Sequence, residues 1–299
     1  MRKTLIIILG PTAVGKTEIG ITLAKKTGTE IISADSRQIF RELKIGTASP
    51  DIKQLKIVPH QFIGTQSIHN YYNASMFEVD VLNLLKEKFT IYDSVLMVGG
   101  SGMYIDAVCS GIDDLPVVDT EIRSRLQDQY HREGIESLRL QLKILDPEYY
   151  SKVDLKNPNR ILKGLEISIM TGKPYSSFLT QKKKIRDFST LKIGLNIGRE
   201  KLYDRINLRV DQMIKKGLLE EARGLYPYRE LNALKTVGYR ELFSYFDGKT
   251  SLDKAIDLIK RNTRRFAKRQ LTWFQRDKDI HWYQPSEIEK VFELTRKIT

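Results

Sequence analysis

Eight residues near the N-terminus have the types and spacing that bind phosphate. The loop directly follows the apolar run Leu5–Leu9. It consists of Gly10, Pro11, Thr12, Ala13, Val14, Gly15, Lys16 and Thr17. The pattern G-x-x-x-x-G-K-[ST] between a buried strand and an amphipathic helix is typical of a loop whose backbone N–H groups surround an anion. We expect Lys16 to contact terminal phosphate oxygens and the Thr17 hydroxyl to bind Mg²⁺, whether the phosphates belong to ATP or to another ligand.

A second polar cluster follows the apolar segment Glu30–Ser33, and it reads Asp35, Ser36, Arg37 and Gln38. The carboxyl ends of strands line the ligand crevice of an open α/β sheet, so this cluster is expected beside the phosphate loop. Asp35 is there a Mg²⁺ ligand, a general base or the N-cap of a helix. Carboxylate and amide groups can also read the edges of nucleobases.

Two further groups have the types that suit a phosphate site. Arg205 and Arg209 lie four residues apart on one predicted helix face, and they either contact phosphate or pair with surface carboxylates. A glycine turn, residues 99–102, follows the apolar segment Ser94–Val98, where many P-loop ATPases carry an aspartate for Mg²⁺. The missing aspartate weakens the case for ATP hydrolysis.

The composition is that of a globular protein with an unusual charge. The chain has 299 residues, of which 41% are hydrophobic, and its formal net charge is +13. A nucleic-acid partner explains this excess, and a basic solvated surface is the alternative. The single cysteine, Cys109, is interpreted as a packing residue rather than a nucleophile. No apolar run approaches roughly 18 residues and no signal peptide is evident, so we expect a cytoplasmic protein without membrane association.

The elements that position these residues alternate between strand and helix in the N-terminal third. Expected strands are Leu5–Leu9, Glu30–Ser33, Gln61–Ile63, Ser94–Val98 and Leu191–Ile197, and expected helices are Thr17–Lys26, Tyr72–Phe89, Asp119–Glu133, Ile135–Leu145 and Asn159–Thr171. Short apolar strands alternating with helices predict an α/β fold, a P-loop NTPase-like doubly wound parallel sheet core with an inserted helical domain. We place the core at residues 1–114 and 190–299 and the insertion at 115–189.

Two long helices are expected towards the C-terminus, at Arg199–Tyr226 and Leu252–Arg276. The second carries a basic stripe on one face, formed by Arg261, Arg265, Lys268 and Arg269. This stripe either contacts phosphates or is a solvated face. The apolar residues Ile256, Ile259, Phe266 and Trp273 are expected to face the core.

Seven motifs in this order resemble a known family. They are residues 10–17 (GPTAVGKT), 32–38 (ISADSRQ), 45–48 (IGTA), 98–104 (VGGSGMY), 159–166 (NRILKGLE), 237–241 (VGYRE) and 268–274 (KRQLTWF). Together they resemble the bacterial tRNA dimethylallyltransferases, also called tRNA isopentenyltransferases. The resemblance covers nearly the whole chain and thins after about Trp282.

The resemblance implies a reaction and a set of site residues. The family transfers a dimethylallyl group from dimethylallyl diphosphate to N6 of the adenosine 3′-adjacent to the anticodon in tRNA, and diphosphate leaves with help from Mg²⁺. It implies that Asp35 is the general base and that Thr12 and Arg209 hold and stabilise the diphosphate. It also implies tRNA contacts, including the anticodon stem-loop, by Asp35, Ser36, Arg37, Gln38, Ser101, Arg123, Asn159, Arg160 and Lys163. We expect a monomer.

The sequence departs from the family pattern at three places. Ser49 and Lys163 stand where the family commonly has Lys and Arg, and Gly64-Thr65 replaces a common acidic position. Two other functions compete with prenyl transfer: an ATP-dependent small-molecule or nucleoside kinase, and a non-catalytic RNA-binding protein. The net charge disfavours the kinase, and the joint presence of Lys16, Thr17, Asp35 and Arg209 disfavours simple binding.

Overall fold

The protein is described by a computed structural model that covers residues 3–116, 119–180 and 182–296. The chain forms two compact units, a core unit of residues 1–110 and 185–299 and an insertion unit of residues 111–184. The expected boundaries, 115 and 189, lie a few residues further along the chain. Within the described ranges, no helix is long and apolar enough to cross a membrane.

A six-stranded sheet forms the centre of the core unit, and all its paired strands are parallel. The strand order is β3-β2-β4-β1-β5-β6. The strands are β1 (Thr4–Leu9), β2 (Ile31–Ala34), β3 (His60–Gln61), β4 (Ser94–Gly99), β5 (Ser189–Leu195) and β6 (Ile280–Tyr283). Every residue of β1, β2 and β4 is buried, as expected for strands covered on both faces. The doubly wound parallel sheet is thereby confirmed.

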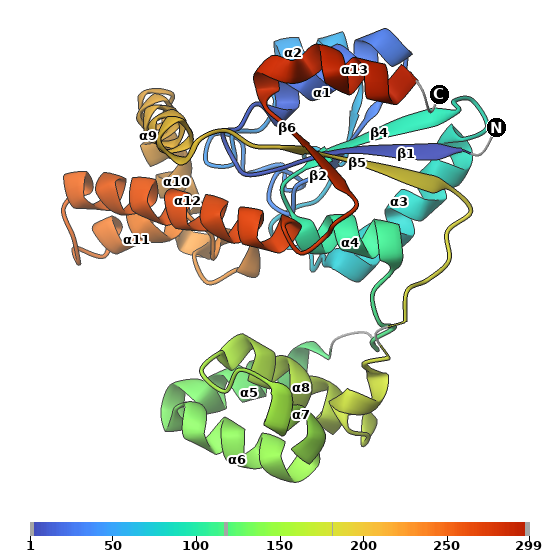
Figure 1. Ribbon diagram of the computed structural model, residues 1–299. Helices are drawn as coiled ribbons and strands as arrows, with labels where there is room; N and C mark the ends of the chain where they lie inside the picture. Colours follow the sequence, from blue (N-terminus) through green and yellow to red (C-terminus); the bar gives the residue numbers. More distant parts are fainter. Residues whose placement is uncertain (1–2, 117–118, 181, 297–299) are drawn as a thin grey trace. The chain divides into compact units, whose positions relative to one another are not determined.

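Helices cover both faces of this sheet (Figure 1). Those of the core unit are α1 (Lys16–Thr27), α2 (Ile52–Ile57), α3 (Ala74–Lys88), α4 (Gly102–Ser110), α9 (Arg199–Lys215), α10 (Leu218–Leu225), α11 (Tyr239–Phe246), α12 (Leu252–Phe274) and α13 (Ile288–Arg296), with the 3₁₀ turns η2 (Tyr226–Tyr228), η3 (Asn232–Leu234) and η4 (Pro285–Glu287). In Figure 1, α1 and α13 lie on one face and α3 and α4 on the other. Residues of α1 and α13 pack into one apolar cluster with β1, β4 and β5.

Several elements of the core unit differ from the sequence-based expectation. The helix expected at Arg199–Tyr226 is two helices, α9 and α10, because Gly217 adopts the left-handed conformation with φ +97° and interrupts it. Strand β6 and helices α2, α4, α11 and α13 were not expected. β6 has only four residues and adds to the edge of the sheet beside β5, so its pairing depends on a strand far away in the sequence.

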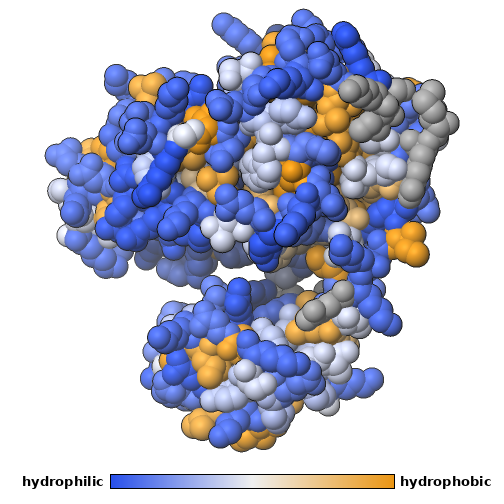
Figure 2. All heavy atoms as spheres, in the orientation of Figure 1, coloured by the Kyte–Doolittle hydropathy of each residue, from blue (hydrophilic) through white to orange (hydrophobic). Residues whose placement is uncertain are grey.

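The insertion unit is helical. It contains α5 (Thr120–Glu133), α6 (Ile135–Leu145), α7 (Pro147–Lys152), α8 (Pro158–Thr171) and η1 (Tyr175–Phe178). Its own apolar core is formed by Leu126, Leu138, Leu142, Ile161 and Leu165. Most of its surface in Figure 2 is hydrophilic, and hydrophobic residues gather at its lower edge over α6, where Leu140 and Ile144 are exposed.

Candidate active site

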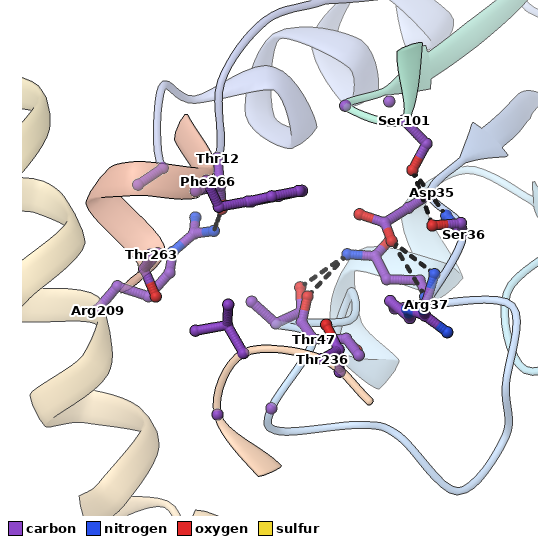
Figure 3. A pocket seen from close by; sticks show the side chains of 18 of the residues that line it. Thr12, Asp35, Ser36, Arg37, Thr47, Ser101, Arg209, Thr236, Thr263 and Phe266 are labelled. Atoms are coloured by element: carbon purple, nitrogen blue, oxygen red, sulfur yellow. Dashed lines mark hydrogen bonds between the residues drawn. The ribbon is translucent and has the colours of Figure 1, made fainter. Parts of the chain in front are cut away.

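One cavity of about 430 Å³ lies in the core unit. It opens at the carboxyl ends of β1, β2 and β4, which is the usual ligand position in open α/β sheets. Its walls come from the phosphate loop, the segments after β2 and β4, and helices α9 and α12. Figure 3 shows Thr12, Arg209 and Phe266 on one side of the cavity and Asp35, Ser36 and Ser101 on the other.

The backbone of the phosphate loop adopts positive φ angles at its two glycines. Gly10 and Gly15 have φ of +145° and +109°. A Cβ on Gly10 would lie 2.4 Å from the carbonyl oxygen of Leu195, so no larger residue fits there. Lys16 donates from Nζ to the carbonyl oxygen of Pro11 at 2.8 Å. Burial lowers the pKa of Lys16 to about 8, although the charge of Asp35 acts in the opposite direction.

Two arginines of α9 contact the phosphate loop. Arg205 donates from Nη1 to the carbonyl oxygen of Val14 at 3.1 Å, and Arg209 Nη1 lies 3.4 Å from the hydroxyl of Thr12. Burial lowers the pKa of Arg209, and its guanidinium remains charged at any physiological pH. Both arginines therefore contact the phosphate loop. The alternative that they pair only with surface carboxylates does not describe these contacts.

Asp35 is held where β2 ends. Its Oδ1 accepts from the backbone N–H groups of Arg37 at 2.9 Å and Gln38 at 3.3 Å. The backbone N–H of Ser36 donates to the hydroxyl oxygen of Ser101 at 2.9 Å. Residues 36–39 form a turn and the next helix, α2, begins at Ile52, so the alternative that Asp35 is the N-cap of a helix is wrong. Asp35 instead closes this turn and lines the cavity, so the turn orients a carboxylate at the crevice.

The side chains of Arg37 and Gln38 bind the protein's own backbone. Arg37 donates from Nη1 to the carbonyl oxygens of Asn232 at 3.2 Å and Ala233 at 3.3 Å. Gln38 donates from Nε2 to both carbonyl oxygens of residues 47–48, at 3.1 and 3.3 Å. These two residues therefore build part of the cavity wall.

A carboxylate that the sequence analysis missed anchors the neighbouring loop. Glu221 on α10 accepts from the backbone N–H groups of Ile45 at 2.8 Å, Gly46 at 2.9 Å and Lys44 at 3.2 Å. It also accepts from the hydroxyl of Tyr239 at 2.7 Å. A Cβ on Gly46 would lie 2.6 Å from the Tyr239 ring, so the loop needs glycine there. The IGTA and VGYRE motifs are in contact at this point. The order of the motifs along the sequence did not predict this contact.

The cavity also has an apolar part. It is formed by Val210, Met213, Leu218, Ile259 and Phe266. Phe266 was expected to face the core, and this is wrong: its side chain is 39% exposed and its ring projects into the cavity (Figure 3). Helical spacing identified the correct side of α12 but could not distinguish a packed core from a lined cavity.

The basic stripe of α12 is exposed. This holds for Arg261, Arg265, Lys268 and Arg269. Arg264, between them in sequence, differs because it donates to Asn207 Oδ1 at 2.6 Å. Exposure agrees with both a solvated face and a phosphate-contacting surface, so the role of the stripe stays a prediction.

The remaining predicted tRNA-binding residues lie in the insertion unit. Asn159 and Arg160 are exposed in the first turn of α8. Arg123 and Lys163 each lie 3.9 Å from the carboxylate of Glu166, which is 1% exposed. Burial raises the pKa of Glu166, and the two cations act against that shift. The unit thus places four of the predicted residues on two adjacent helices, α5 and α8, which pack together.

Comparisons with known proteins agree with these motifs. Residues 38–277 match the model of the IPP transferase family. The tRNA dimethylallyltransferase 1 of Bacteroides fragilis is 54% identical over 97% of this chain and 96% of its own length. The crystal structure of the tRNA isopentenylpyrophosphate transferase of Bacillus halodurans is similar with a TM-score of 0.71 at 34% identity, covering 99% of this chain and 96% of that one.

A crystal structure of a eukaryotic dimethylallyltransferase acting on tRNA is also similar. Its TM-score is 0.74 at 26% identity, and the match covers 94% of this chain and 73% of that one. The matched relatives cover nearly the full length of this chain. The matches therefore include the phosphate loop, the polar cluster after β2 and the arginines of α9. This protein belongs to the IPP transferase family, whose matched relatives are tRNA dimethylallyltransferases.

Proposed function

We propose that this protein transfers a dimethylallyl group from dimethylallyl diphosphate to N6 of the adenosine 3′-adjacent to the anticodon in tRNA. The observation that carries the proposal is a cavity with the phosphate loop on one side and a carboxylate, Asp35, on the other. A transfer between a diphosphate and a nucleobase amine needs both groups in one site. A cytoplasmic location follows from the tRNA substrate.

Asp35 acts as the general base in this proposal. The N6 amine attacks C1 of the dimethylallyl group, the C1–O bond breaks, and the proton of the amine passes to the Asp35 carboxylate. A positioned base typically contributes about 10²–10⁴-fold to the rate. The hydrogen bonds from Arg37 N and Gln38 N fix the carboxylate before the substrate arrives.

The phosphate loop stabilises the leaving diphosphate. Its residues 10–17, with Lys16, Thr12 and Arg209 around the same space, present donors where negative charge increases in the transition state. Removing one such donor typically costs about 10²–10³-fold in kcat. The apolar part of the cavity, with Phe266 and Ile259, suits the isoprenoid chain.

Mg²⁺ is the metal that these residues suit. Within the described residues there is no cluster of three or more His, Cys, Asp or Glu side chains that would form a complete metal cage. Mg²⁺ is commonly held by few protein oxygens together with substrate phosphates and water, and the Thr17 hydroxyl beside the loop fits that pattern. When bound, the ion would neutralise charge on the diphosphate.

The tRNA partner accounts for the charge of the chain and for the accessory residues. A target adenine must leave the base stack to enter a cavity. Proteins recognise RNA sequence mostly in single-stranded loops, and the anticodon loop is one of these. We assign contacts with the anticodon stem-loop to residues 35–38, Ser101 and the insertion residues Arg123, Asn159, Arg160 and Lys163. We propose that the protein acts as a monomer.

The test is an incubation of the purified protein with radiolabelled dimethylallyl diphosphate, Mg²⁺ and an unmodified anticodon stem-loop RNA. Prenylated adenosine in the digested RNA is the expected product. An RNA with guanosine in place of the target adenosine is the matched control and should remain unlabelled. ATP turnover on a small acceptor without prenylated RNA would overturn the proposal in favour of a kinase.

A further inference from the structure

Gln270 joins two segments that lie far apart in the sequence. It is on α12, and its side chain is buried, with 7% exposed. Its Oε1 accepts from the backbone N–H of Thr12 in the phosphate loop at 2.9 Å. Its Nε2 donates to the carbonyl oxygen of Gly100, in the turn after β4, at 2.9 Å. The side-chain amide of Gln270 therefore connects two walls of the cavity, accepting a hydrogen bond from one and donating a hydrogen bond to the other.

The contact between α12 and this turn leaves no free space. A Cβ on Gly100 would lie 2.3 Å from Nε2 of Gln270. One turn of helix later, Trp273 donates from Nε1 to Asp106 Oδ2 at 2.9 Å, and a Cβ on Gly102 would lie 2.2 Å from the Trp273 ring. The glycines of the turn are thus the residues that allow α12 to pack directly on it.

The same turn supports Asp35. The backbone N–H of Ser101 donates to the carbonyl oxygen of Ala34 at 3.2 Å, and the hydroxyl of Ser101 accepts from the N–H of Ser36 at 2.9 Å. Both chain neighbours of Asp35 are therefore tied to the residue that follows Gly100. Hydrogen bonds therefore link Thr12 through Gln270 to Gly100, and those of the next residue, Ser101, reach the segment that carries Asp35.

We propose that Gln270 is a positioning residue for prenyl transfer, whose amide sets the separation between the phosphate loop at Thr12 and the turn that supports Asp35. The proposal rests on the function proposed above. The amine that attacks and the diphosphate that leaves are held on these two walls, so their alignment depends on this separation. A misplacement of about 1 Å between reacting groups can cost about 10²-fold in rate.

The chemistry of the amide makes the proposal testable with two variants. Gln270→Met removes both hydrogen bonds at similar volume. Gln270→Glu keeps an acceptor for Thr12 N–H, but its ionised carboxylate cannot donate to the carbonyl oxygen of Gly100. Protonation restores that donor, and a buried carboxyl protonates more readily than an exposed one because burial raises its pKa. The Gln270→Glu defect should therefore shrink as pH falls.

The experiment measures the single-turnover rate of prenyl transfer with saturating RNA and donor, together with RNA affinity and the thermal midpoint. We expect both variants to lose about 10²-fold in rate while RNA affinity stays within about threefold. The rate relative to wild type at the same pH should recover towards acid pH for Gln270→Glu and stay constant for Gln270→Met. Gln275→Met, at an exposed glutamine that ends the same helix, is the control and should match wild type.

Two outcomes would overturn the inference. One is a wild-type rate in folded Gln270→Met or Gln270→Glu. The other is a loss in Gln270→Glu that does not recover towards acid pH, which would show that restoring the donor to the carbonyl oxygen of Gly100 does not restore the rate. A wild-type protein that forms no prenylated RNA would instead overturn the proposed function, and this outcome is read in the same assay.

Discussion

The two sides of the cavity differ in the charges that they carry. On the Asp35 side, Asp35, Arg37 and Gln38 all form hydrogen bonds with the protein's own backbone. On the phosphate side, Lys16 rests on the carbonyl oxygen of Pro11, and burial lowers the pKa of both Lys16 and Arg209. On the first side a carboxylate, Asp35, stands beside Arg37, whose pKa burial also lowers, whereas the second side presents two cations, Lys16 and Arg209. Backbone N–H groups therefore fix the carboxylate of Asp35, and the phosphate side concentrates positive charge.

The largest effect should come from Asp35→Asn. The amide oxygen can still accept from Arg37 N and Gln38 N, so the wall keeps its shape while the base is lost. We expect the single-turnover rate to fall by about 10²–10⁴-fold, with a smaller change in tRNA affinity. Asp35→Ala should show the same order of effects. Wild-type turnover in either variant would exclude Asp35 as the base.

Arg209→Gln tests the phosphate side. The variant keeps a donor near Thr12 but removes the charge, and we expect kcat to fall by about 10²–10³-fold. Lower affinity for inorganic diphosphate should accompany the loss, measured by calorimetry. If only RNA binding changed, Arg209 would belong to the RNA surface and the contrast between the two sides would fail.

Charge reversal on α12 should separate the RNA surface from both sides of the cavity. The triple variant Arg261→Glu, Arg265→Glu and Lys268→Glu leaves the cavity-lining Arg269 unchanged. It should weaken tRNA binding and lower the slope of log K against log salt concentration by about 2–3. The measurement is RNA affinity against salt concentration. An unchanged slope would identify the stripe as a solvated face.

The pH dependence of donor affinity should report Lys16. The diphosphate binds the protonated lysine, so affinity is unaffected by this group below its pKa of about 8 and falls above it by up to about tenfold per pH unit. Because the ligand's negative charge raises the pKa again, binding above pH 8 should take up a proton. Lys16→Met should bind more weakly with no such dependence, and a wild-type profile that is flat through this range would contradict the assignment.

The smallest effect concerns the loop held by Glu221. Tyr239→Phe removes one hydrogen bond to that carboxylate, and we expect the free energy of unfolding to fall by about 1.5–3 kcal/mol. Denaturant unfolding measures this value. The rate at saturating substrates should stay near that of wild type, because the three backbone N–H groups still bind Glu221.

Local sequence patterns predicted most of the sheet and many of the helices. The apolar runs at β1, β2 and β4 and the amphipathic stretches at α1, α5 and α6 appear close to their expected bounds. These elements depend on periodicity and capping within a few residues. Strand β6 was missed because a four-residue edge strand becomes recognisable only through its neighbour, β5.

For the site, residue types and spacing determined the phosphate loop, the polar cluster at Asp35 and the family of the chain, because each is encoded within a short segment or in the order of motifs. Tertiary structure alone decided that Phe266 faces the cavity, that Glu221 anchors the loop at Gly46 and that Gln270 bridges Thr12 and Gly100. The bridge joins residues 258 positions apart in one direction and 170 in the other. Such contacts depend on how helices pack on the sheet, and no local pattern of residues records that packing.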